Sequence, residues 1–515
     1  MNITRRLVLG SVATLLGFNA AQAADLPVKA KPVEYVRICS PYGAGFFYIP
    51  GTDTCLKLGG YLRVDTTFNG GIQGAPAWNG DIGQENRYRN YFAARSRMLL
   101  SVDTRTATEY GVVRTFGEAR FQFSTLGNST QNPNSLATNL GNNPNLLDTA
   151  GNGYVSIANL FIQFAGFTFG KSASAYSSPW HGFPGNISDN LLGGQNIDTG
   201  VNNIQYTTSF GNGVSATIGL DDPVVWDRTA VFNLTTGLNA VGTTGNAYAG
   251  VRAPDIVGNI RIDQAWGLFQ ISADAHNVSG SYNNLTAGTA APTNLSEISG
   301  HPSDKWGGSV MAALQIKNIP TGAGDDIKLD ATWAKGVTKN VISTTGASPS
   351  FAMFGGSGRA YQSVGFGATT DAVWVPAGTV VGGDGSLHLT EAYGIRGAFN
   401  HNWDPHWSTS LYGSYSAVRY DGTAKAFYCA AYTSGKVVSA DYSCNPDFMV
   451  SQLGLVTRWT PVKNLTFSAE VQWFHLDQKF MGTAVLTPSA PKPTAAYEFK
   501  DQDTVFLQVR AQRNF

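Results

Sequence analysis

Arginine side chains recur at alternate positions in three consecutive stretches near the start of the sequence. These arginines are Arg63, Arg95, Arg97, Arg105, Arg114 and Arg120. Successive side chains of an extended strand point to opposite faces, so each stretch would present its arginines on one face. Guanidinium groups fixed along a water-filled passage would attract anions and orient polar solutes in their field. The pattern therefore indicates an electrostatic filter. The alternative is that these arginines only hydrate a polar face or pair locally with Asp103, Glu109 and Glu118.

Strands with a period of two run through the whole chain and would position these arginines. About sixteen segments show the alternation. They are 56–65, 91–105, 110–123, 154–164, 167–172, 203–210, 214–221, 255–263, 267–275, 306–316, 327–335, 387–400, 407–420, 449–459, 465–476 and 504–515.

The connections between these segments alternate strictly between short and long. Long connections rich in Gly, Asn, Ser and Thr are expected at 66–90, 124–153, 173–202, 222–254, 276–305, 336–386, 421–448 and 477–503. An up-and-down transmembrane barrel has short turns on one side and long loops on the other. Such a sheet must close, because an open edge cannot satisfy its backbone groups in hydrocarbon. A barrel of about sixteen strands is also wide enough to leave an aqueous channel.

The last strand carries a further signal at its end. Val505, Leu507 and Val509 share one face, and Gln508 and Arg510 share the other. The first face is expected to meet outer-membrane lipid and the second to meet water. The terminal Phe515 resembles the closing aromatic of bacterial outer-membrane barrels, which the barrel-assembly machinery reads.

The first residues have the form of an export signal. Arg5 and Arg6 precede an apolar run, and an Ala-x-Ala site favours cleavage after Ala23. No later run of ~20 apolar residues suggests a transmembrane helix. Beyond residue 23 the chain has 33 basic and 35 acidic side chains, which offers no surface for nucleic acid.

The four cysteines fall into two close pairs. An even count at short separations in an exported chain favours disulfides, Cys39–Cys55 and Cys429–Cys444. No histidine lies near either pair, which argues against a metal site. The chain also lacks a Gly-x-Ser-x-Gly elbow, a His-Glu-x-x-His motif and a P-loop, so neither an enzyme nor a cofactor is expected.

Several motifs carry a family resemblance. ADLPVKAKPVE at residues 24–34, CSPYGAGFFYIPGTDTC at 39–55 and LGGYLR at 58–63 closely resemble the alphaproteobacterial porin family. The resemblance extends to Phe515. It implies a trimeric, 16-stranded general porin that passes small hydrophilic solutes and ions by passive diffusion.

The resemblance also suggests a role for the third long connection. In general porins this loop folds inward, so Asp189 and Asp198 are candidate acidic partners of the arginines. The alternative is a solvated external loop.

The sequence thus predicts an all-β outer-membrane protein with three regions. Residues 1–23 would be a signal peptide, 24–55 an N-terminal segment, and 56–515 an antiparallel transmembrane barrel with an inward-folded third loop. A different possibility is an adhesin or surface-structural barrel with a plugged lumen.

Overall fold

The protein folds as a closed β-barrel. The computed structural model describes residues 37–515 apart from 72–73, 88, 125–145, 149–152, 346–347 and 380–381. Its largest sheet has 18 described strands, of which the short β1 (Phe47–Tyr48) and β5 (Leu146–Asp148) stand outside the ring, leaving sixteen. Each ring strand pairs antiparallel with its neighbour along the chain. The last strand pairs with the first, with Arg510 opposite Asp65, which closes the barrel.

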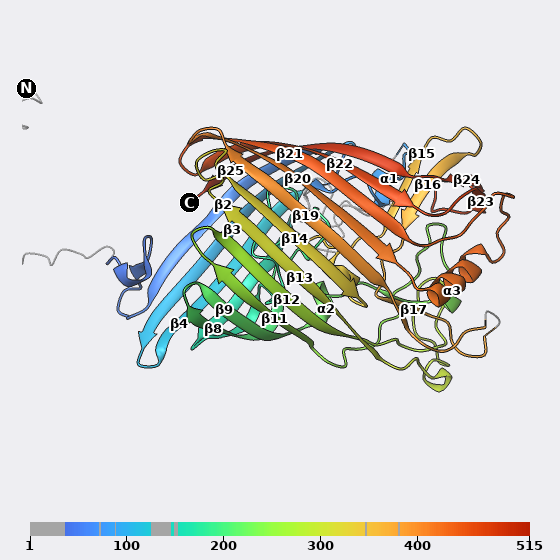
Figure 1. Cartoon of the computed structure of the whole chain (residues 1–515), viewed down its shortest axis with the longest axis horizontal. Coiled ribbons are helices and arrows are strands. Elements are labelled where there is room, and N and C mark those ends of the chain that lie inside the picture. Colours follow the sequence, from blue (N-terminus) through green and yellow to red (C-terminus); the bar gives the residue numbers. More distant parts are fainter. Residues whose placement is uncertain are drawn as a thin grey trace, which may run out of the picture.

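The ring strands follow one another in chain order (Figure 1). They are β2 (Cys55–Phe68), β3 (Phe92–Thr108), β4 (Gly111–Ser124), β6 (Gly153–Phe164), β7 (Phe167–Ser172), β8 (Val201–Gly211), β9 (Val214–Asp221), β11 (Asp255–Asp263), β12 (Gly267–Val278), β13 (Lys305–Lys317), β14 (Asp326–Lys335), β19 (Glu391–Asn402), β20 (Trp407–Arg419), β21 (Phe448–Val462), β22 (Leu465–Gln478) and β25 (Gln502–Asn514). All sixteen coincide with segments predicted from the period of two, and the expected fold is confirmed.

The two faces of the ring strands also follow the prediction. Val505, Leu507 and Val509 are exposed on the outer wall, where a bilayer would cover them. Gln508 and Arg510 point inward, but they are buried instead of facing open water. The reason is that other parts of the chain fill much of the barrel interior.

The long connections contain structure that the sequence pattern did not predict. The expected strand 387–400 is interrupted, because β18 (His388–Leu389) pairs with a loop strand and only β19 joins the ring. Three helices, two small sheets of loop strands and several 3-10 turns lie in the described connections. The helices are α1 (Gly80–Gly83), α2 (Pro223–Trp226) and α3 (Gly422–Thr433), and the loop strands are β10 (Val231–Asn233), β15 (Phe351–Gly355), β16 (Gln362–Gly367), β17 (Ala372–Trp374), β23 (Thr483–Leu486) and β24 (Ala495–Phe499).

These elements gather at one end of the barrel (Figure 1). We call this end external and its packed loops the external cap, defined by residues 230–242, 348–376, 420–447 and 479–499. Asp421 caps the N-terminus of helix α3, and its carboxylate accepts a hydrogen bond from the backbone N–H of Ala424. None of the helices in the described ranges is long and apolar enough to span a membrane.

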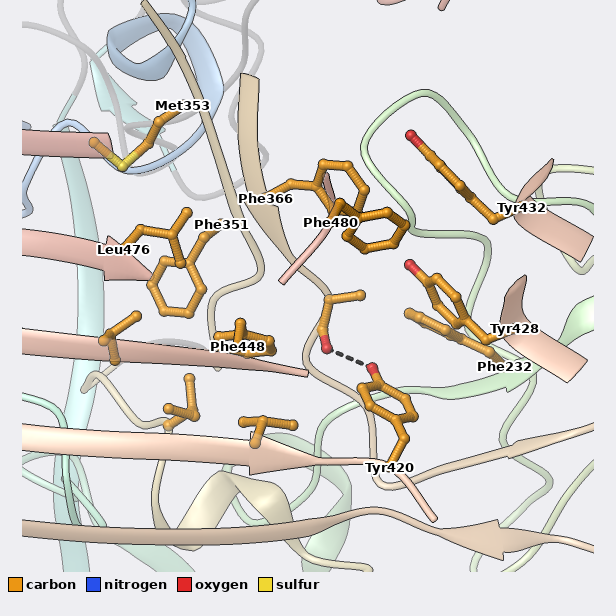
Figure 2. Packing of buried hydrophobic residues seen from close by; sticks show 14 of the residues in the cluster. Phe232, Phe351, Met353, Phe366, Tyr420, Tyr428, Tyr432, Phe448, Leu476 and Phe480 are labelled. Carbon is orange, nitrogen blue, oxygen red and sulfur yellow. Dashed lines mark hydrogen bonds between the residues drawn. The ribbon is translucent and has the colours of Figure 1, made fainter. Parts of the chain in front are cut away.

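An apolar core holds the external cap together (Figure 2). Phe351, Phe366 and Phe448 are buried in it, together with the inner faces of α3. The phenol of Tyr420 donates to the carbonyl of Ala368 at 2.6 Å, and that of Tyr432 donates to Ala240 at 2.9 Å. Burying these rings while satisfying their hydroxyls fixes the loops against one another.

Both expected disulfides are present. Cys429–Cys444 ties α3 to the chain that returns to β21. Cys39–Cys55 ties the N-terminal segment to the first residue of β2, at the opposite end of the barrel from the cap (Figure 1). Residues 1–36, including the expected signal peptide, and most of the expected connection 124–153 lie outside the described residues.

Replacing Cys429 and Cys444 together with serine should loosen the cap without opening the barrel. The two cysteines are 15 residues apart in the sequence. In the chain-entropy model, a disulfide that closes a loop of this length stabilises the folded state by about 3 kcal/mol. We expect faster tryptic cleavage at Lys436, measured by mass spectrometry, with unchanged heat-modifiable migration of the barrel. The Cys39/Cys55 double serine variant is the control. Equal cleavage rates in both variants would contradict this role.

Candidate functional site

Arginines from four adjacent strands meet on the inner face of the barrel. We call Arg63, Arg95, Arg97, Arg120 and Arg510 the arginine wall. Strand register explains the grouping. Arg63 lies directly opposite Arg97, and Arg120 lies opposite Leu99, which is two residues from Arg97 on the same face of β3. Arg63 donates to Gln512 at 2.7 Å, and Arg97 donates to Gln122 at 2.7 Å. The predicted Arg63, Arg95, Arg97 and Arg120 are thus brought together.

Asp65 is the acid embedded in this wall. It lies between Arg510 and Arg95 in one row across β25, β2 and β3. Nε of Arg510 donates to Oδ1 at 2.6 Å, and Nε of Arg95 donates to Oδ2 at 2.8 Å. One carboxylate therefore orients two guanidinium groups and cancels only one of their charges.

Arg105 and Arg114 lie apart from the wall, nearer the turn between β3 and β4. Both donate to Asp103, Arg114 at 3.0 Å and Arg105 at 3.1 Å. Their directly opposite positions place two like charges side by side, and the shared carboxylate offsets them. For these two arginines, the local pairing considered from the sequence is what the structure shows.

The third long connection folds into the barrel, as the porin resemblance implied. We call residues 173–200 the inner loop. Nearly all of them are buried, and Tyr176, Leu191 and Leu192 are almost fully so. Gln270 of β12 donates to the carbonyl of Ser177 at 2.7 Å. The inner loop is therefore packed against the barrel wall instead of solvated outside it.

A glutamate on β22, the strand next to β25, binds the tip of the inner loop. Glu470 of β22 is fully buried and accepts the backbone N–H groups of Ile187 at 3.0 Å and Ser188 at 2.8 Å. Gln452 on the neighbouring β21 makes two more bonds: it accepts from the N–H of Leu192 and donates to the carbonyl of Asn190, both at 2.8 Å. These contacts satisfy backbone groups that would otherwise be buried without partners.

A buried ion pair supports the flank of the inner loop. Arg396 of β19 lies 3.0 Å from Asp330 of β14, and both side chains are almost fully buried. The same guanidinium donates to the carbonyls of Gly194 at 3.0 Å and Gln195 at 2.7 Å. Trp180 donates to the second oxygen of Asp330 at 2.6 Å. Arg396 thus uses its fork of donors to hold the loop to the wall.

Through these contacts the inner loop carries its two acids to the arginine wall. Asp198 lies 2.8 Å from Arg120, and Asp189 lies 3.9 Å from Arg95. The Asp198 side chain stays about one-third exposed, at 34%. The acids of the inner loop therefore contact arginines of the wall directly.

Sequence reasoning missed several residues of this arrangement. Asp65, Glu470, Asp330 and Arg396 were not singled out, although each lies on the polar face of a predicted strand. Their inward facing could have been read from the period of two. Their partners could not, because the loop backbone that Glu470 and Arg396 bind lies about 200 residues or more away in the sequence. In the described ranges, no three His, Cys, Asp or Glu side chains are grouped so as to hold a metal ion.

Phe515 extends the pairing between the last and first barrel strands at the end of the barrel that carries the short turns. Its backbone N–H and carbonyl both bond to Gly60 of β2, at 3.1 and 3.2 Å. The residue is 61% exposed, although its phenyl ring lies over Gly60. Most of the side chain is therefore accessible to another protein.

Deleting Phe515 should impair assembly more than conductance. The two backbone bonds to Gly60 are the last of the closing ladder, and most of the Phe515 residue is exposed. We expect a several-fold lower yield of heat-modifiable barrel in membranes, with normal conductance in the channels that form. Phe515→Tyr is the matched control, since it keeps an aromatic end. A normal yield without Phe515 would contradict the assembly role.

A closed antiparallel ring with an apolar outer wall and a charged interior defines a transmembrane β-barrel of the outer-membrane type. Residues 25–507 match the porin subfamily, so the chain belongs to the porin family and to the outer membrane. The porin Omp2b of Brucella abortus is 35% identical over 272 residues, covering 52% of this chain and 64% of that protein. Omp2b of Brucella melitensis is 34% identical over the same span.

The chain thus spans just under two thirds of the length of these curated relatives. Among solved structures, the outer membrane channel DcaP of Acinetobacter baumannii aligns with a TM-score of 0.54 at 14% identity. The alignment covers 91% of this chain and 99% of DcaP. At that identity the likeness supports the fold alone.

Proposed function

We propose that this porin forms a passive diffusion channel for small hydrophilic molecules and ions. The observation that carries the proposal is the apposition of the inner-loop acids Asp189 and Asp198 to the arginine wall inside a closed barrel of sixteen strands. Charges fixed on one wall in this way create a local field that orients polar solutes and makes the passage of an ion depend on the sign of its charge.

The constriction is proposed to comprise the arginine wall, Asp65, Asp189 and Asp198. Arg105 and Arg114 would act on the turn side of it, with their charge reduced by Asp103. Solute movement needs no covalent step, and we propose neither a catalytic residue nor a cofactor. Residues 1–23 are proposed to be a cleaved signal peptide, which agrees with a family match that begins at residue 25.

The partners of the protein are also proposals. We infer a homotrimer in outer-membrane lipid, because the Omp2b relatives are porins and the family resemblance implies a trimer. The exposed Phe515 supports recognition by the barrel-assembly machinery. The barrel interior provides the route for solutes and ions in transit.

Purified protein in a planar lipid bilayer tests this function. A diffusion channel should insert with stepwise conductance, and a trimer should give steps in groups of three. Single conductance steps would support the channel but contradict the homotrimer. A silent membrane, with correctly folded protein shown by heat-modifiable migration, would overturn the channel.

A second function is a surface-structural barrel with a plugged lumen. It is favoured by the external cap and by loop residues such as Val337, Val341 and Ile342, which are fully buried beside the inner loop. The hydrogen bond from the N–H of Gly193 to the carbonyl of Val341 joins these two loops. This function predicts the silent membrane, so the same bilayer experiment separates the two.

A further inference from the structure

We propose that a pocket on the external rim, outside the diffusion path, binds an uncharged saccharide. The external-rim pocket has a volume of about 440 Å³, which is within the usual range for small-ligand sites. Polar side chains that line it are Asn69, Glu85, Arg89, Gln502, Asp503 and Thr504, together with Tyr91. Ile82 and Phe354 form an apolar floor. Three segments distant in sequence therefore converge on one concave surface.

Arg89 is held rigidly in this pocket. Its Nη2 donates to Oδ1 of Asn69 at 2.5 Å, and Nη1 lies 3.6 Å from Oε1 of Glu85. The guanidinium also lies over the Tyr91 ring, 4.7 Å from its centroid. The Arg89 side chain is only 9% exposed, yet its Nε–H has no acceptor. A buried donor without a partner is costly, so a shift of the Arg89 side chain that gives this N–H a ligand oxygen would be favoured.

Asp503 offers the complementary acceptor. Its Oδ1 lies 2.9 Å from both Nε1 of Trp473 and Nδ1 of His475, which fix the carboxylate in place. The Asp503 side chain is 57% exposed, so the carboxylate remains accessible to a ligand. A fixed donor and a fixed acceptor can bind neighbouring hydroxyl groups of one sugar ring.

The charges around the pocket oppose an ionic ligand. Glu85 lies 3.6 Å from Arg89, Asp503 lines the same pocket, and Lys492 lies behind the floor with its Nζ 4.1 Å from the Phe354 ring centroid. Burial lowers the pKa of Lys492 to about 8, so it remains largely charged at neutral pH. The two acids and two bases nearly cancel, which removes the attraction for phosphates or carboxylates.

The apolar surfaces fit the other side of a sugar. A pyranose ring has a C–H face that packs on aromatic and aliphatic groups while its hydroxyls bind polar side chains. Tyr91 is 60% exposed, and Ile82 and Phe354 are buried under the pocket. Tyr91 therefore supplies the exposed apolar surface beside the polar side chains, and Ile82 and Phe354 support the pocket from beneath.

The pocket lies where the apolar outer wall ends. Asp503 is on the same outward face of β25 as Val505 and Leu507, which are exposed toward lipid. Helix α1 and β15 lie together at the same external end (Figure 1), joined by the bond from the N–H of Ala352 to the carbonyl of Trp78. The saccharide could therefore be the headgroup of a glycolipid or a free oligosaccharide.

Binding to the full-length barrel in nanodiscs tests the proposal. Maltose in solution is the free-sugar probe, and glucosyl diacylglycerol in the nanodisc is the lipid probe. Saturation-transfer NMR should show saturable binding to at least one of them. Binding to maltose alone would identify a free-sugar site, and binding to the glycolipid alone would identify a headgroup site. Glucose 1-phosphate should bind more weakly than maltose or not at all.

Arg89→Ala should weaken the observed binding at least tenfold, and Asp503→Asn is a second variant if the first does not fold. Arg87→Ala is the matched control, because Arg87 is exposed on the same connection and outside the pocket. Conductance should be unchanged in all three variants, which separates this site from the channel. Absent binding, binding insensitive to Arg89→Ala and Asp503→Asn, or preference for glucose 1-phosphate would overturn the proposal.

Discussion

Replacing Arg63, Arg97 and Arg120 together with glutamine should shift the ion selectivity of the channel toward cations. These three arginines can be neutralised without touching the Arg510–Asp65–Arg95 row, which keeps its ion pairs. A unit charge at 4 Å in water contributes about 1 kcal/mol, equivalent to roughly a fivefold change in an ion's occupancy. We therefore expect the potassium-to-chloride permeability ratio to rise by about that factor, as measured by reversal potential in a salt gradient.

The control for this triple variant is Arg359→Gln. Arg359 is an exposed arginine of the external cap, paired with Asp441 and Glu498. It should leave the reversal potential unchanged. The shift in the triple variant should also shrink at high salt, because screening shortens the reach of each charge. An unchanged permeability ratio at low salt would contradict the role of the arginine wall as the ion filter, but it would not bear on the barrel fold.

Replacing Glu470 with glutamine should loosen the inner loop and make the channel noisier. The carboxylate accepts two backbone N–H groups, and hydrogen bonds to charged groups contribute about 1.5–3 kcal/mol each. Glutamine keeps one acceptor and introduces a donor against the loop backbone. A cost of about 2 kcal/mol would raise the population of undocked loop roughly 30-fold. Single-channel recordings should show this as frequent fluctuations to higher conductance.

The matched control is Glu391→Gln on the outer wall. Glu391 accepts a hydrogen bond from Trp333 at 2.6 Å and does not contact the inner loop. Its recordings should resemble those of the unmodified protein. Heat-modifiable migration of both variants checks that the barrel is closed. Equal noise in the Glu470 variant and the control would mean that the inner loop does not move in the conduction path.

Much of the barrel could be predicted from the chain alone because strand alternation is local. Each residue of a strand faces inward or outward by its position in the pleat, whatever its distant neighbours are. That rule placed Val505 and Leu507 on the outer wall and Arg95 and Arg97 on the inner one. A sheet that crosses a membrane must also close into a barrel, because the backbone groups of an open edge cannot be satisfied in lipid.

The cap could not be predicted in the same way. Helix α3 buries Ala424, Tyr428 and Tyr432, which are spaced four residues apart. That spacing indicates a buried helix face only once Phe366 and the covering loops are known to pack against it. The ring strand begins at Glu391 instead of the predicted residue 387 for a similar reason, because His388 pairs with Val373 of another loop strand. Tertiary contacts decided both outcomes.

The functional site likewise combines features that follow from local strand pattern with features that depend on tertiary contacts. The sequence by itself determined a closed barrel with arginines on its inner face, because both follow from a period of two and from the chemistry of lipid. Only the tertiary structure decided that Asp65 holds two of those arginines, and that Asp189 and Asp198 reach the wall from the inner loop. Those acids are positioned by Glu470, Arg396 and Asp330, which lie on strands far along the chain. Such long-range pairing has no local pattern, so it appears only when the barrel has closed around its loop.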